Sequence, residues 1–360
     1  MSTTGPTGTK SATGITVLAA GDHFVLPRLL SEEVRRATGG AVHVRELTLP
    51  WPHTPFGPVG EVIEASGTED ELIEALRGAE VCVTQMAPLT ERVLAACPDL
   101  KLMCVSRGGP VNANLEAATR HGVAVCYAPG RNAVATAEHT LTLLLAAARG
   151  VGDTHTDLRK GVWRGDYYDY DNCGIEIEGA TVGLVGYGAI GSRVARILVA
   201  MGAEVLVHDP YVSPEALAGI GEQVPLEELL TRSRIVSLHA RVTEETKGMI
   251  GAEQIALMPR GSVLVNCARG ALLDYDAVCD ALDSGQLSGA GFDVYPHEPV
   301  PADSRLLATP GIVMTPHIAG ASQEVAHKAA RIVAAEVGRF LRGEPLAHCA
   351  NPEVFAGRTR

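Results

Sequence analysis

The feature that most constrains this chain is a strand–turn–helix–strand pattern over residues 181–209. Its parts follow in the order apolar strand, glycine-rich turn, helix and second apolar strand, at residues 181–185, 186–191, 192–201 and 204–207. The turn reads Gly-Tyr-Gly-Ala-Ile-Gly, and the second strand leads to Asp209, 18 residues after Gly191. A glycine-rich turn between a strand and a helix, with an acidic residue after the next strand, predicts a dinucleotide-binding βαβ unit.

Each glycine of this turn has a physical reason to be glycine. Gly186 permits the tight turn, Gly188 lets the backbone approach a pyrophosphate, and Gly191 lets helix and strand pack closely. The start of the helix presents unpaired N–H groups and the positive end of its dipole to the phosphates. The predicted cofactor contacts of the turn therefore also include Ala189 and Ile190.

Asp209 and the adjacent Pro210 are predicted to contact the adenosine end of the cofactor. A carboxylate at Asp209 can accept hydrogen bonds from both ribose hydroxyls, and its charge would repel a 2′-phosphate. The sequence therefore predicts NAD rather than NADP. The motif taken alone is also compatible with an ordinary glycine-rich turn, but here the strand, helix, second strand and terminal acid all agree.

Strand and helix patterns alternate through most of the chain. Before residue 128, strands are expected at residues 15–20, 42–47, 81–84, 102–106 and 123–126. Helices are expected between them, at residues 29–37, 69–76, 91–96 and 115–121. The alternation resumes from residue 181 to about 317, and a last helix is expected at residues 323–342. This alternation predicts parallel sheets covered by helices.

A long helix, expected at residues 135–149, joins the two blocks and is apolar on nearly every face. Such a helix indicates burial between domains or subunits. Residues 151–179 are expected to hold a helix and a long connection rich in Tyr and Asp. A length of 360 residues favours two domains. We therefore expect an α/β fold class with two Rossmann-like, doubly wound parallel-sheet domains and a cleft between them.

Composition excludes some partners. The formal net charge of −12 argues against nucleic acid and anionic membranes, because both need a basic protein face. The eight cysteines form no C-x-x-C pair and read as buried thiols of a reducing compartment. No signal-peptide pattern opens the chain, and the apolar stretches are too short to span a bilayer. We expect a cytoplasmic protein with no metal site, and a tail at residues 1–12.

Three further motifs follow apolar strands, reading NCARG at residues 266–270, FDVYPHEP at residues 292–299 and TPHIAG at residues 315–320. In chain order, the three motifs contain Arg269, Glu298 and His317, one residue each. Hydride transfer to a ketone leaves charge on oxygen, so a proton must arrive, and histidine suits that task. A carboxylate stabilises a charged histidine, and a guanidinium can hold a carboxylate and polarise a carbonyl. Each residue alone could be merely structural; the ordered set favours catalysis.

From about residue 100 to 342, the chain resembles the D-isomer-specific 2-hydroxyacid dehydrogenases, which include phosphoglycerate dehydrogenase and glyoxylate reductase. The first 95 residues match only in general pattern. The resemblance implies hydride transfer between the nicotinamide of NAD and C2 of a small D-2-hydroxy acid or 2-oxo acid. His317 would be the proton donor and acceptor, Glu298 its hydrogen-bond partner, and Arg269 the residue that binds the substrate carboxylate and the reacting oxygen.

The resemblance also assigns a substrate loop at residues 106–109, whose backbone N–H groups help hold the carboxylate. Predicted substrate contacts are therefore Arg107, Gly108 and Gly109, together with Arg269 and His317. Arg107 could instead only flank the loop. If Arg107 and Arg241 both face the cleft, a phosphate or phosphonate on the substrate becomes plausible.

Three more residues are expected at the cofactor. Asp293 resembles the residue placed near the nicotinamide ring, His239 is expected to line the cofactor pocket, and Ala268 adjoins it. The segment after His239 departs from the family, because Arg241 and Val242 replace a usual Pro-Leu. Arg241 could extend a positive cleft, but a solvated arginine at a strand end is the favoured interpretation.

The resemblance implies a discontinuous architecture. Residues 13–127 and 319–360 would form the substrate domain, and residues 128–318 the NAD-binding domain, with domain closure excluding water. A small anionic substrate is the expected ligand. A homodimer is expected through the NAD-binding domain, and the apolar helix at residues 135–149 fits such an interface.

Other interpretations stay open. The same scaffold could serve a phosphorylated, phosphonate or phosphite substrate, whereas Glu298 counts against formate. A non-enzymatic, NAD(H)-sensing regulator of corepressor type is a further alternative. The Pro-rich loop with Trp51, His53 and Phe56 could roof the active site, although an ordinary surface turn is favoured. Cys267 reads as a strand-packing residue.

Overall fold

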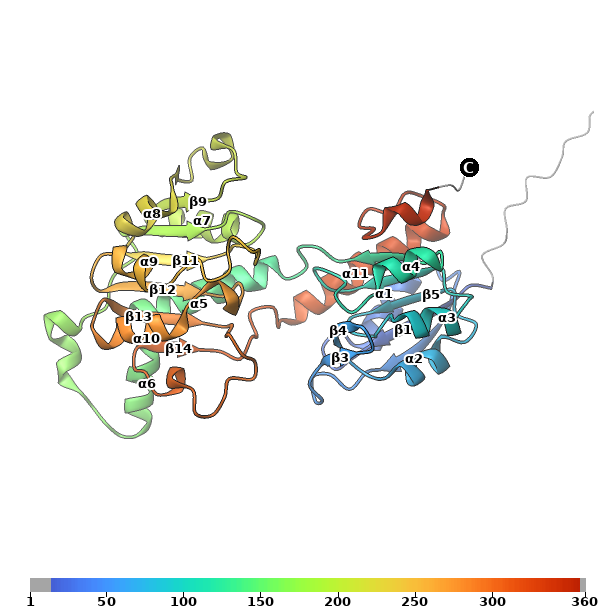
Figure 1. Ribbon diagram of the computed structural model, residues 1–360, viewed down its shortest axis with the longest axis horizontal. Coiled ribbons are helices and arrows are strands. Elements are labelled where there is room, and N and C mark those ends of the chain that lie inside the picture. Colours follow the sequence, from blue (N-terminus) through green and yellow to red (C-terminus); the bar gives the residue numbers. More distant parts are fainter. Residues whose placement is uncertain (1–13, 357–360) are drawn as a thin grey trace, which may run out of the picture. The chain divides into compact units, whose positions relative to one another are not determined.

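The computed structural model describes residues 14–356, which divide into two compact units (Figure 1). Unit 1 comprises residues 14–132 and 321–356, and unit 2 comprises residues 133–320. The boundaries expected from the sequence lay slightly earlier in the chain. The tail expected at residues 1–12 lies outside the described residues.

Unit 1 is built on a five-stranded parallel sheet with the order β2-β1-β5-β6-β7. Its strands are β1 (Thr16–Gly21), β2 (His43–Thr48), β5 (Val81–Thr84), β6 (Leu102–Val105) and β7 (Ala124–Tyr127). Its helices are α1 (Pro27–Ala37), α2 (Glu69–Leu76), α3 (Glu91–Ala96), α4 (Leu115–Arg120) and α11 (Gln323–Leu341), with a 3-10 turn η6 (Pro352–Phe355). A short antiparallel hairpin, β3 (Gly57–Val59) and β4 (Val62–Ala65), lies outside this sheet, and no strands were predicted there from the sequence.

Both faces of the unit 1 sheet are covered, which explains its continuous apolar strands. Every residue of β5 and β6 is buried. Alternate side chains pack against α1 and α11 on one face and against α2, α3 and α4 on the other. Thr68 and Glu71 form a capping box that starts α2, and Thr90 caps α3.

Unit 2 is built on a seven-stranded parallel sheet with the order β10-β9-β8-β11-β12-β13-β14. Its strands are β8 (Thr181–Val185), β9 (Glu204–His208), β10 (Glu222–Gln223), β11 (Ile235–Leu238), β12 (Ser262–Asn266), β13 (Leu287–Phe292) and β14 (Ile312–Met314). The helices α5 (Ala133–Ala148) and α7 (Gly191–Ala200) cover one face, and α8 (Leu226–Arg232), α9 (Ala252–Leu257) and α10 (Tyr275–Asp283) cover the other.

Shorter elements complete unit 2. They are the helix α6 (Val151–Arg159) and the 3-10 turns η1 (Gly165–Tyr168), η2 (Tyr170–Asn172), η3 (Pro214–Leu217), η4 (Gly270–Leu272) and η5 (Arg305–Leu307). Figure 1 shows α6 next to β14, at one end of the sheet, and the segment with η1 and η2 follows α6. This segment matches the stretch where the sequence shows few periodic signals.

The fold class expected from the sequence, two doubly wound α/β units with parallel sheets, is confirmed. The strand order reverses between β1 and β5 in unit 1, and between β8 and β11 in unit 2. In sheets of this kind, ligands bind beside such a switch point, at the carboxyl ends of the strands. The carboxyl edge of each sheet is therefore the place to look for a site.

The structure shows the state of the cysteines and tests the helices for membrane spans. All eight cysteines are free thiols, and six of them are buried. The expectation of burial is wrong for Cys173, which lies in the exposed segment after α6, and Cys349 is only partly buried. Within residues 14–356, no helix combines the length and the apolar character needed to cross a membrane.

Candidate active site

The glycine-rich turn after β8 has two crowded glycines and one open glycine. Gly186 has a φ of +103°, and a Cβ on it would lie 2.7 Å from the carbonyl carbon of His239. A Cβ on Gly191 would lie 2.3 Å from the oxygen of Gly186. A Cβ on Gly188 would meet no atom within 4 Å. Two glycines thus allow close packing, and the third leaves the backbone open on the side where a pyrophosphate would approach.

Asp209 follows β9 and lies next to the same turn. Its Oδ2 accepts a hydrogen bond of 2.7 Å from the N–H of Tyr187, and its Oδ1 accepts one of 2.9 Å from the N–H of Tyr211. Each carboxylate oxygen keeps a further lone pair for a ribose hydroxyl. Pro210 and Ala189 are exposed, and Ile190 is partly buried at the start of α7. These residues fit the adenosine and pyrophosphate parts of a dinucleotide.

His239 follows β11, across the switch point from the glycine-rich turn. The backbone N–H of His239 donates to the carbonyl oxygen of Val185 at 2.7 Å, and the ring Nε2 lies 3.1 Å from the hydroxyl of Ser237. Burial lowers the pKa of His239 to about 4, so the ring is neutral at pH 7. The sequence placed His239 at the cofactor pocket but gave no signal for Ser237.

The structure brings two predicted catalytic residues into direct contact. Nδ1 of His317 lies 2.6 Å from Oε2 of Glu298, and Oε1 of Glu298 accepts a hydrogen bond of 3.0 Å from the N–H of Tyr295. The side chain of His317 is 48% exposed, and its Nε2 contacts no polar group of the described residues. Because Nδ1 is held by the carboxylate, Nε2 is the nitrogen left to face a ligand.

The backbone of His317 is unusual, and Asp293 holds it. His317 has a φ of +54°, in the left-handed region that few residues other than glycine adopt. Asp293 is fully buried at the end of β13. Its Oδ1 accepts from the hydroxyl of Thr315 at 2.6 Å and from the N–H of Ile318 at 2.8 Å, and its Oδ2 accepts from the N–H of Ala319 at 2.8 Å. These bonds clamp both sides of His317; the place of Asp293 near nicotinamide stays a prediction.

Two further side chains hold the same loop, and sequence reasoning missed both. The hydroxyl of Tyr295 lies 3.0 Å from the oxygen of Phe292 and 2.8 Å from the oxygen of Thr315. Burial raises the pKa of Tyr295, so its hydroxyl stays a donor. His139 of α5 places Nε2 2.8 Å from the hydroxyl of Thr315. The only sequence signal for His139 was a polar residue in a long apolar helix.

Arg269 is exposed in the turn after β12, and its neighbours fix the turn. Nδ2 of Asn266 donates to the oxygen of Arg269 at 2.9 Å, and Oδ1 of Asn266 accepts from the N–H of Ala268 at 3.0 Å. A Cβ on Gly270 would lie 2.0 Å from the oxygen of Tyr295, so this turn packs directly on the loop that carries Glu298. Nη1 of Arg269 donates to the oxygen of Ala268 at 2.7 Å, and Arg269 has no ion pair with any described residue.

The predicted substrate loop lies in unit 1, after β6. Arg107 is mostly buried and forms an ion pair with the carboxylate of Glu64, and its Nη1 also donates to the oxygen of Glu64 at 3.2 Å. A Cβ on Gly108 or on Gly109 would meet no atom within 4 Å. The two glycines are therefore open, whereas the charge of Arg107 is already balanced. Glu64, 43 residues away, gave no signal in the sequence.

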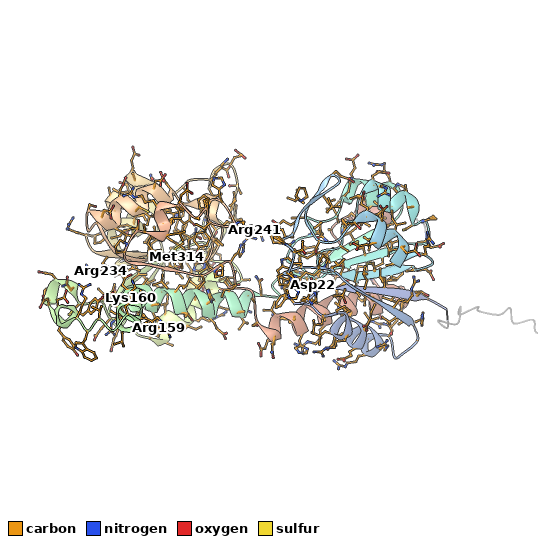
Figure 2. All side chains as sticks on the ribbon, turned by 90° about the horizontal axis from the view of Figure 1, so that it is seen from below. Asp22, Arg159, Lys160, Arg234, Arg241 and Met314 are labelled. Atoms are coloured by element: carbon orange, nitrogen blue, oxygen red, sulfur yellow. The ribbon has the colours of Figure 1, made fainter. Side chains whose placement is uncertain are left out.

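The residues that the sequence marked less clearly show only packing contacts or exposure to solvent. Arg241 is exposed on unit 2 and forms no ion pair within residues 14–356 (Figure 2). Trp51 packs on the core of unit 1 and meets Phe24 edge-on, while the ring of His53 stacks on His23 at 4.1 Å. Cys267 is buried in the core, and burial raises the pKa of its thiol to about 12. This agrees with a packing role for Cys267.

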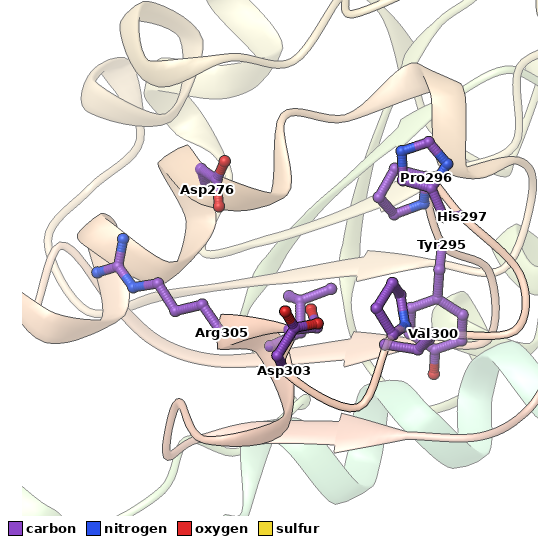
Figure 3. A pocket seen from close by; sticks show the side chains of 10 residues that line it. Asp276, Tyr295, Pro296, His297, Val300, Asp303 and Arg305 are labelled. Carbon is purple, nitrogen blue, oxygen red and sulfur yellow. The ribbon is translucent and has the colours of Figure 1, made fainter.

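A hollow of about 250 Å³ in unit 2 lies beside the loop after β13 (Figure 3). Its lining includes Tyr295, His297, Asp303 and Arg305. Arg269, Glu298 and His317 do not line it, so it is not the place where the predicted catalytic groups meet. In the described part of the chain, no group of three or more His, Cys, Asp or Glu side chains is arranged to hold a metal ion.

Comparison with known proteins adds independent findings. Residues 141–319 match the model of the D-isomer specific 2-hydroxyacid dehydrogenase, NAD binding domain. The glyoxylate reductase of Korarchaeum cryptofilum is 36% identical over 297 residues, which cover 82% of this chain and 90% of that protein. The D-3-phosphoglycerate dehydrogenase of Methanocaldococcus jannaschii is 38% identical over 291 residues, which cover 79% of this chain and 54% of that protein. This chain thus spans about half the length of the phosphoglycerate dehydrogenases it matches.

A solved structure shows the same likeness over nearly the whole chain. The TT0316 protein of Thermus thermophilus superposes with a TM-score of 0.76 at 31% sequence identity. The match covers 93% of this chain and 100% of that one.

Proposed function

Because this chain belongs to the D-isomer specific 2-hydroxyacid dehydrogenase family, we propose that it is an NAD-dependent oxidoreductase for a small D-2-hydroxy acid and its 2-oxo acid. One observation carries the proposal. His317 is held at Nδ1 by Glu298 at 2.6 Å and has its other nitrogen free, at the carboxyl edge of the sheet that also carries the glycine-rich turn. Acid–base chemistry and dinucleotide binding thus belong to one edge of one sheet.

The glycine-rich turn and Asp209 would hold NAD, which supplies or accepts the hydride when it is bound. The open backbone at Gly188 and the first N–H groups of α7 suit the pyrophosphate. Asp209 would accept the two ribose hydroxyls and repel a 2′-phosphate, which favours NAD over NADP. His239, neutral because of its burial, would border the pocket without adding charge.

The side chains of unit 2 would manage the proton and the substrate charge. In the reducing direction, His317 would donate a proton from Nε2 to the carbonyl oxygen, while Glu298 holds the proton on Nδ1 and stabilises the ring orientation. Arg269 would hold the substrate carboxylate and stabilise charge that develops on the reacting oxygen. In the oxidising direction, Nε2 of His317 would take the hydroxyl proton.

The substrate carboxylate has a second proposed contact in unit 1, the open loop at Gly108 and Gly109. The second charge of a phosphorylated or phosphonate substrate is compatible with the same chemistry, and relatives of this chain are named phosphoglycerate dehydrogenases. We retain a small 2-hydroxy acid as the minimal substrate.

We further propose that the protein is a homodimer. Large apolar side chains are exposed along the segment of unit 2 that begins at α6: Val151, Leu158, Val162, Trp163, Tyr168 and Tyr170. Trp163 is 85% exposed, and several large apolar side chains exposed in one segment favour burial against a second copy. The mass in solution, measured by light scattering, tests this, and a monomeric mass would contradict it. The free thiols also fit the proposed cytoplasmic location.

The catalytic proposal is tested with the full chain, NADH and a panel of small 2-oxo acids, following absorbance at the nicotinamide band. We expect at least one 2-oxo acid to be reduced. Phosphite and formate with NAD⁺ serve as comparison substrates. Tight NADH binding without turnover of any substrate would contradict the proposal and favour a regulatory protein.

A further inference from the structure

The carboxyl edge of the unit 1 sheet gathers polar groups that have no use in the proposed chemistry. Four of its side chains have buried atoms without a hydrogen-bond partner among residues 14–356: Asp22 Oδ2, Gln85 Oε1, Ser106 Oγ, and Arg131 Nε and Nη1. Unpaired polar atoms inside a protein are rare, because each costs free energy when it leaves water. Several of them at one edge indicate a group that these atoms are arranged to meet.

These residues surround the topological switch point of unit 1. Asp22 directly follows β1, and Gln85 directly follows β5, the two strands between which the order reverses. Ser106 directly follows β6, and Arg131 follows β7 by four residues. Because all these strands are parallel, their carboxyl ends lie at one edge. This is the position where sheets of this type bind ligands.

The loop that carries Arg131 is held in place by hydrogen bonds of its neighbouring residues. The N–H of Ala128 donates to the oxygen of Arg107 at 2.7 Å, which ties the loop after β7 to the loop after β6. Nζ of Lys328 on α11 donates to the oxygen of Gly130 at 3.2 Å. The loop is thus anchored on both sides, and the guanidinium of Arg131 still has three N–H donors without a protein acceptor on its Nε and Nη1.

The charge of Arg131 is not balanced by a direct contact. Burial and the like charge of Arg107 lower the pKa of Arg131 to about 10, so it remains a cation at pH 7. Glu64 pairs with Arg107, whereas Arg131 forms no ion pair with a described residue. A buried cation without a partner is strongly unfavourable, which makes an anion the expected complement.

Asp22 does not supply that complement. Its Oδ1 accepts from the N–H groups of Phe24 and Val25, both at 2.8 Å, so one oxygen is used by the turn after β1. Its Oδ2 is unpaired, and burial raises the pKa of this carboxyl to about 6 despite the nearby charges of Arg131 and Arg107. Figure 2 shows where Asp22 lies within unit 1.

We propose that Arg131 binds a phosphate or phosphonate group of the ligand at the switch point of unit 1, with the hydroxyl of Ser106 as a further donor. The three free N–H donors of Arg131 and one O–H match an oxyanion with several acceptor oxygens. Resting on the proposed function, this makes the substrate a 2-oxo or 2-hydroxy acid that bears a second, phosphorus-centred acidic group. Gln85 Oε1 remains as an acceptor for a ligand hydroxyl.

Binding is tested first without any cofactor. The full chain is titrated with inorganic phosphate and with phosphonoacetate by calorimetry, and acetate is the comparison ligand. We expect Arg131→Met to weaken phosphonoacetate binding by at least about tenfold. Arg36→Met is the matched control, because Arg36 is exposed in the last turn of α1, at the opposite end of that helix from Asp22. Its affinity should equal that of the wild type.

The result that overturns the proposal is equal affinity of the wild type and Arg131→Met, or no binding by the wild type. If Arg131→Met does not fold, Arg131→Lys decides, since it keeps the charge but loses the planar set of donors. An unchanged affinity in Arg131→Lys would then overturn the proposal. Equal affinity together with a loss of unfolding free energy in Arg131→Met would assign Arg131 a purely structural role.

A kinetic experiment separates this proposal from the proposed function. The kcat/KM of NADH-dependent reduction is compared for 3-phosphonopyruvate and pyruvate. We expect Arg131→Met to lower the ratio of the two values by at least about tenfold. An unchanged ratio would overturn the phosphonate site while the dehydrogenase activity stands. If the wild type reduces neither acid, the proposed function fails for these substrates, and the calorimetric result still decides on Arg131.

Discussion

The carboxyl edges of the two sheets differ in how their polar groups are satisfied. In unit 2, both oxygens of Asp293 and both oxygens of Glu298 are hydrogen-bonded. In unit 1, Asp22 keeps one buried oxygen unpaired, and Arg131 keeps two buried nitrogens unpaired within the described residues. Where the buried polar groups at a sheet edge already have hydrogen-bond partners, the edge is organised before a ligand arrives. Where buried polar groups lack partners, a ligand can supply them.

Because the two edges differ in this way, substitutions at them should differ in their effect on the stability of the folded protein. At the edge of unit 2, a change breaks bonds that already exist, so the loop around His317 should lose stability or activity. At the edge of unit 1, removing an unpaired polar atom should relieve the folded protein and harm only ligand binding.

The largest effect is expected at His317. His317→Asn should lower kcat by roughly 10³-fold, since general acid–base groups contribute about 10²–10⁴-fold. NADH affinity should stay within about twofold, because the side chain is not part of the proposed dinucleotide contact. Steady-state kinetics and fluorescence titration measure the two quantities. His43→Asn, an exposed histidine of β2, is the control. Retention of more than about a tenth of kcat would remove His317 from the proposed proton transfer.

Asp293 should have the largest effect on stability. Asp293→Asn would turn an amide N–H₂ toward groups that now donate to the carboxylate, and it should cost roughly 3–5 kcal/mol of unfolding free energy. Urea denaturation measures this cost. Asp283→Asn is the matched control, because Asp283 is exposed and pairs with Arg305 at the surface. If both variants lose the same stability, the clamp around His317 does not stabilise the fold as described.

Substitution of Asp22 should change stability in the opposite direction, raising the unfolding free energy at neutral pH. Burial raises the pKa of its carboxyl from 3.8 to about 6, so the folded state binds the proton more tightly than the unfolded state. Its contribution to stability therefore falls as the pH rises from about 4 to about 6 and stays low above that. Asp22→Asn should be more stable than the wild type by roughly 2–3 kcal/mol at pH 7.5 and equal to it near pH 4.

Urea denaturation at the two pH values tests the prediction for Asp22. The asparagine keeps an oxygen for the N–H groups of Phe24 and Val25, so the turn after β1 should persist. Lower stability of Asp22→Asn at pH 7.5 would show that the unpaired oxygen has a stabilising partner. In that case the contrast between the two edges breaks down.

The smallest effect is expected at Gly188, whose backbone is open at the unit 2 edge. Gly188→Ala should weaken NADH binding by about tenfold, because the added methyl group occupies the side where the pyrophosphate approaches. Its unfolding free energy should stay within about 0.5 kcal/mol of the wild type, since the methyl group meets no protein atom. Gly191→Ala should instead lose stability, because its Cβ would clash with Gly186. Equal NADH affinity of Gly188→Ala and the wild type would contradict the proposed phosphate contact.

Much of the fold was predictable from the sequence because its signals are local. The helices α2 and α3 and the strand β5 have the bounds that their apolar patterns and capping residues indicate. The glycine-rich turn was readable for the same reason. The hairpin of β3 and β4 was not foreseen, since its short strands carry no periodic apolar pattern and lie in a segment with several prolines.

The candidate site was predictable in its residues but not in its supports. His317 and Glu298 follow neighbouring strands, so their meeting could be expected from parallel topology. The clamp by Asp293, the pairing of Glu64 with Arg107 and the isolation of Arg131 depend on contacts between distant segments. Such contacts leave no periodic signal in one sequence, and only the packed structure reveals them.

We propose that this chain moves a hydride between nicotinamide and C2 of a small 2-hydroxy or 2-oxo acid. The most direct measurement runs the wild type with 4,4-dideuterated NADH and a 2-oxo acid, and follows the label by mass spectrometry with chiral separation of the product. We expect a D-2-hydroxy acid that carries one deuterium at C2. NADH binding with no labelled hydroxy acid from any 2-oxo acid, or a product of the opposite configuration, would contradict it.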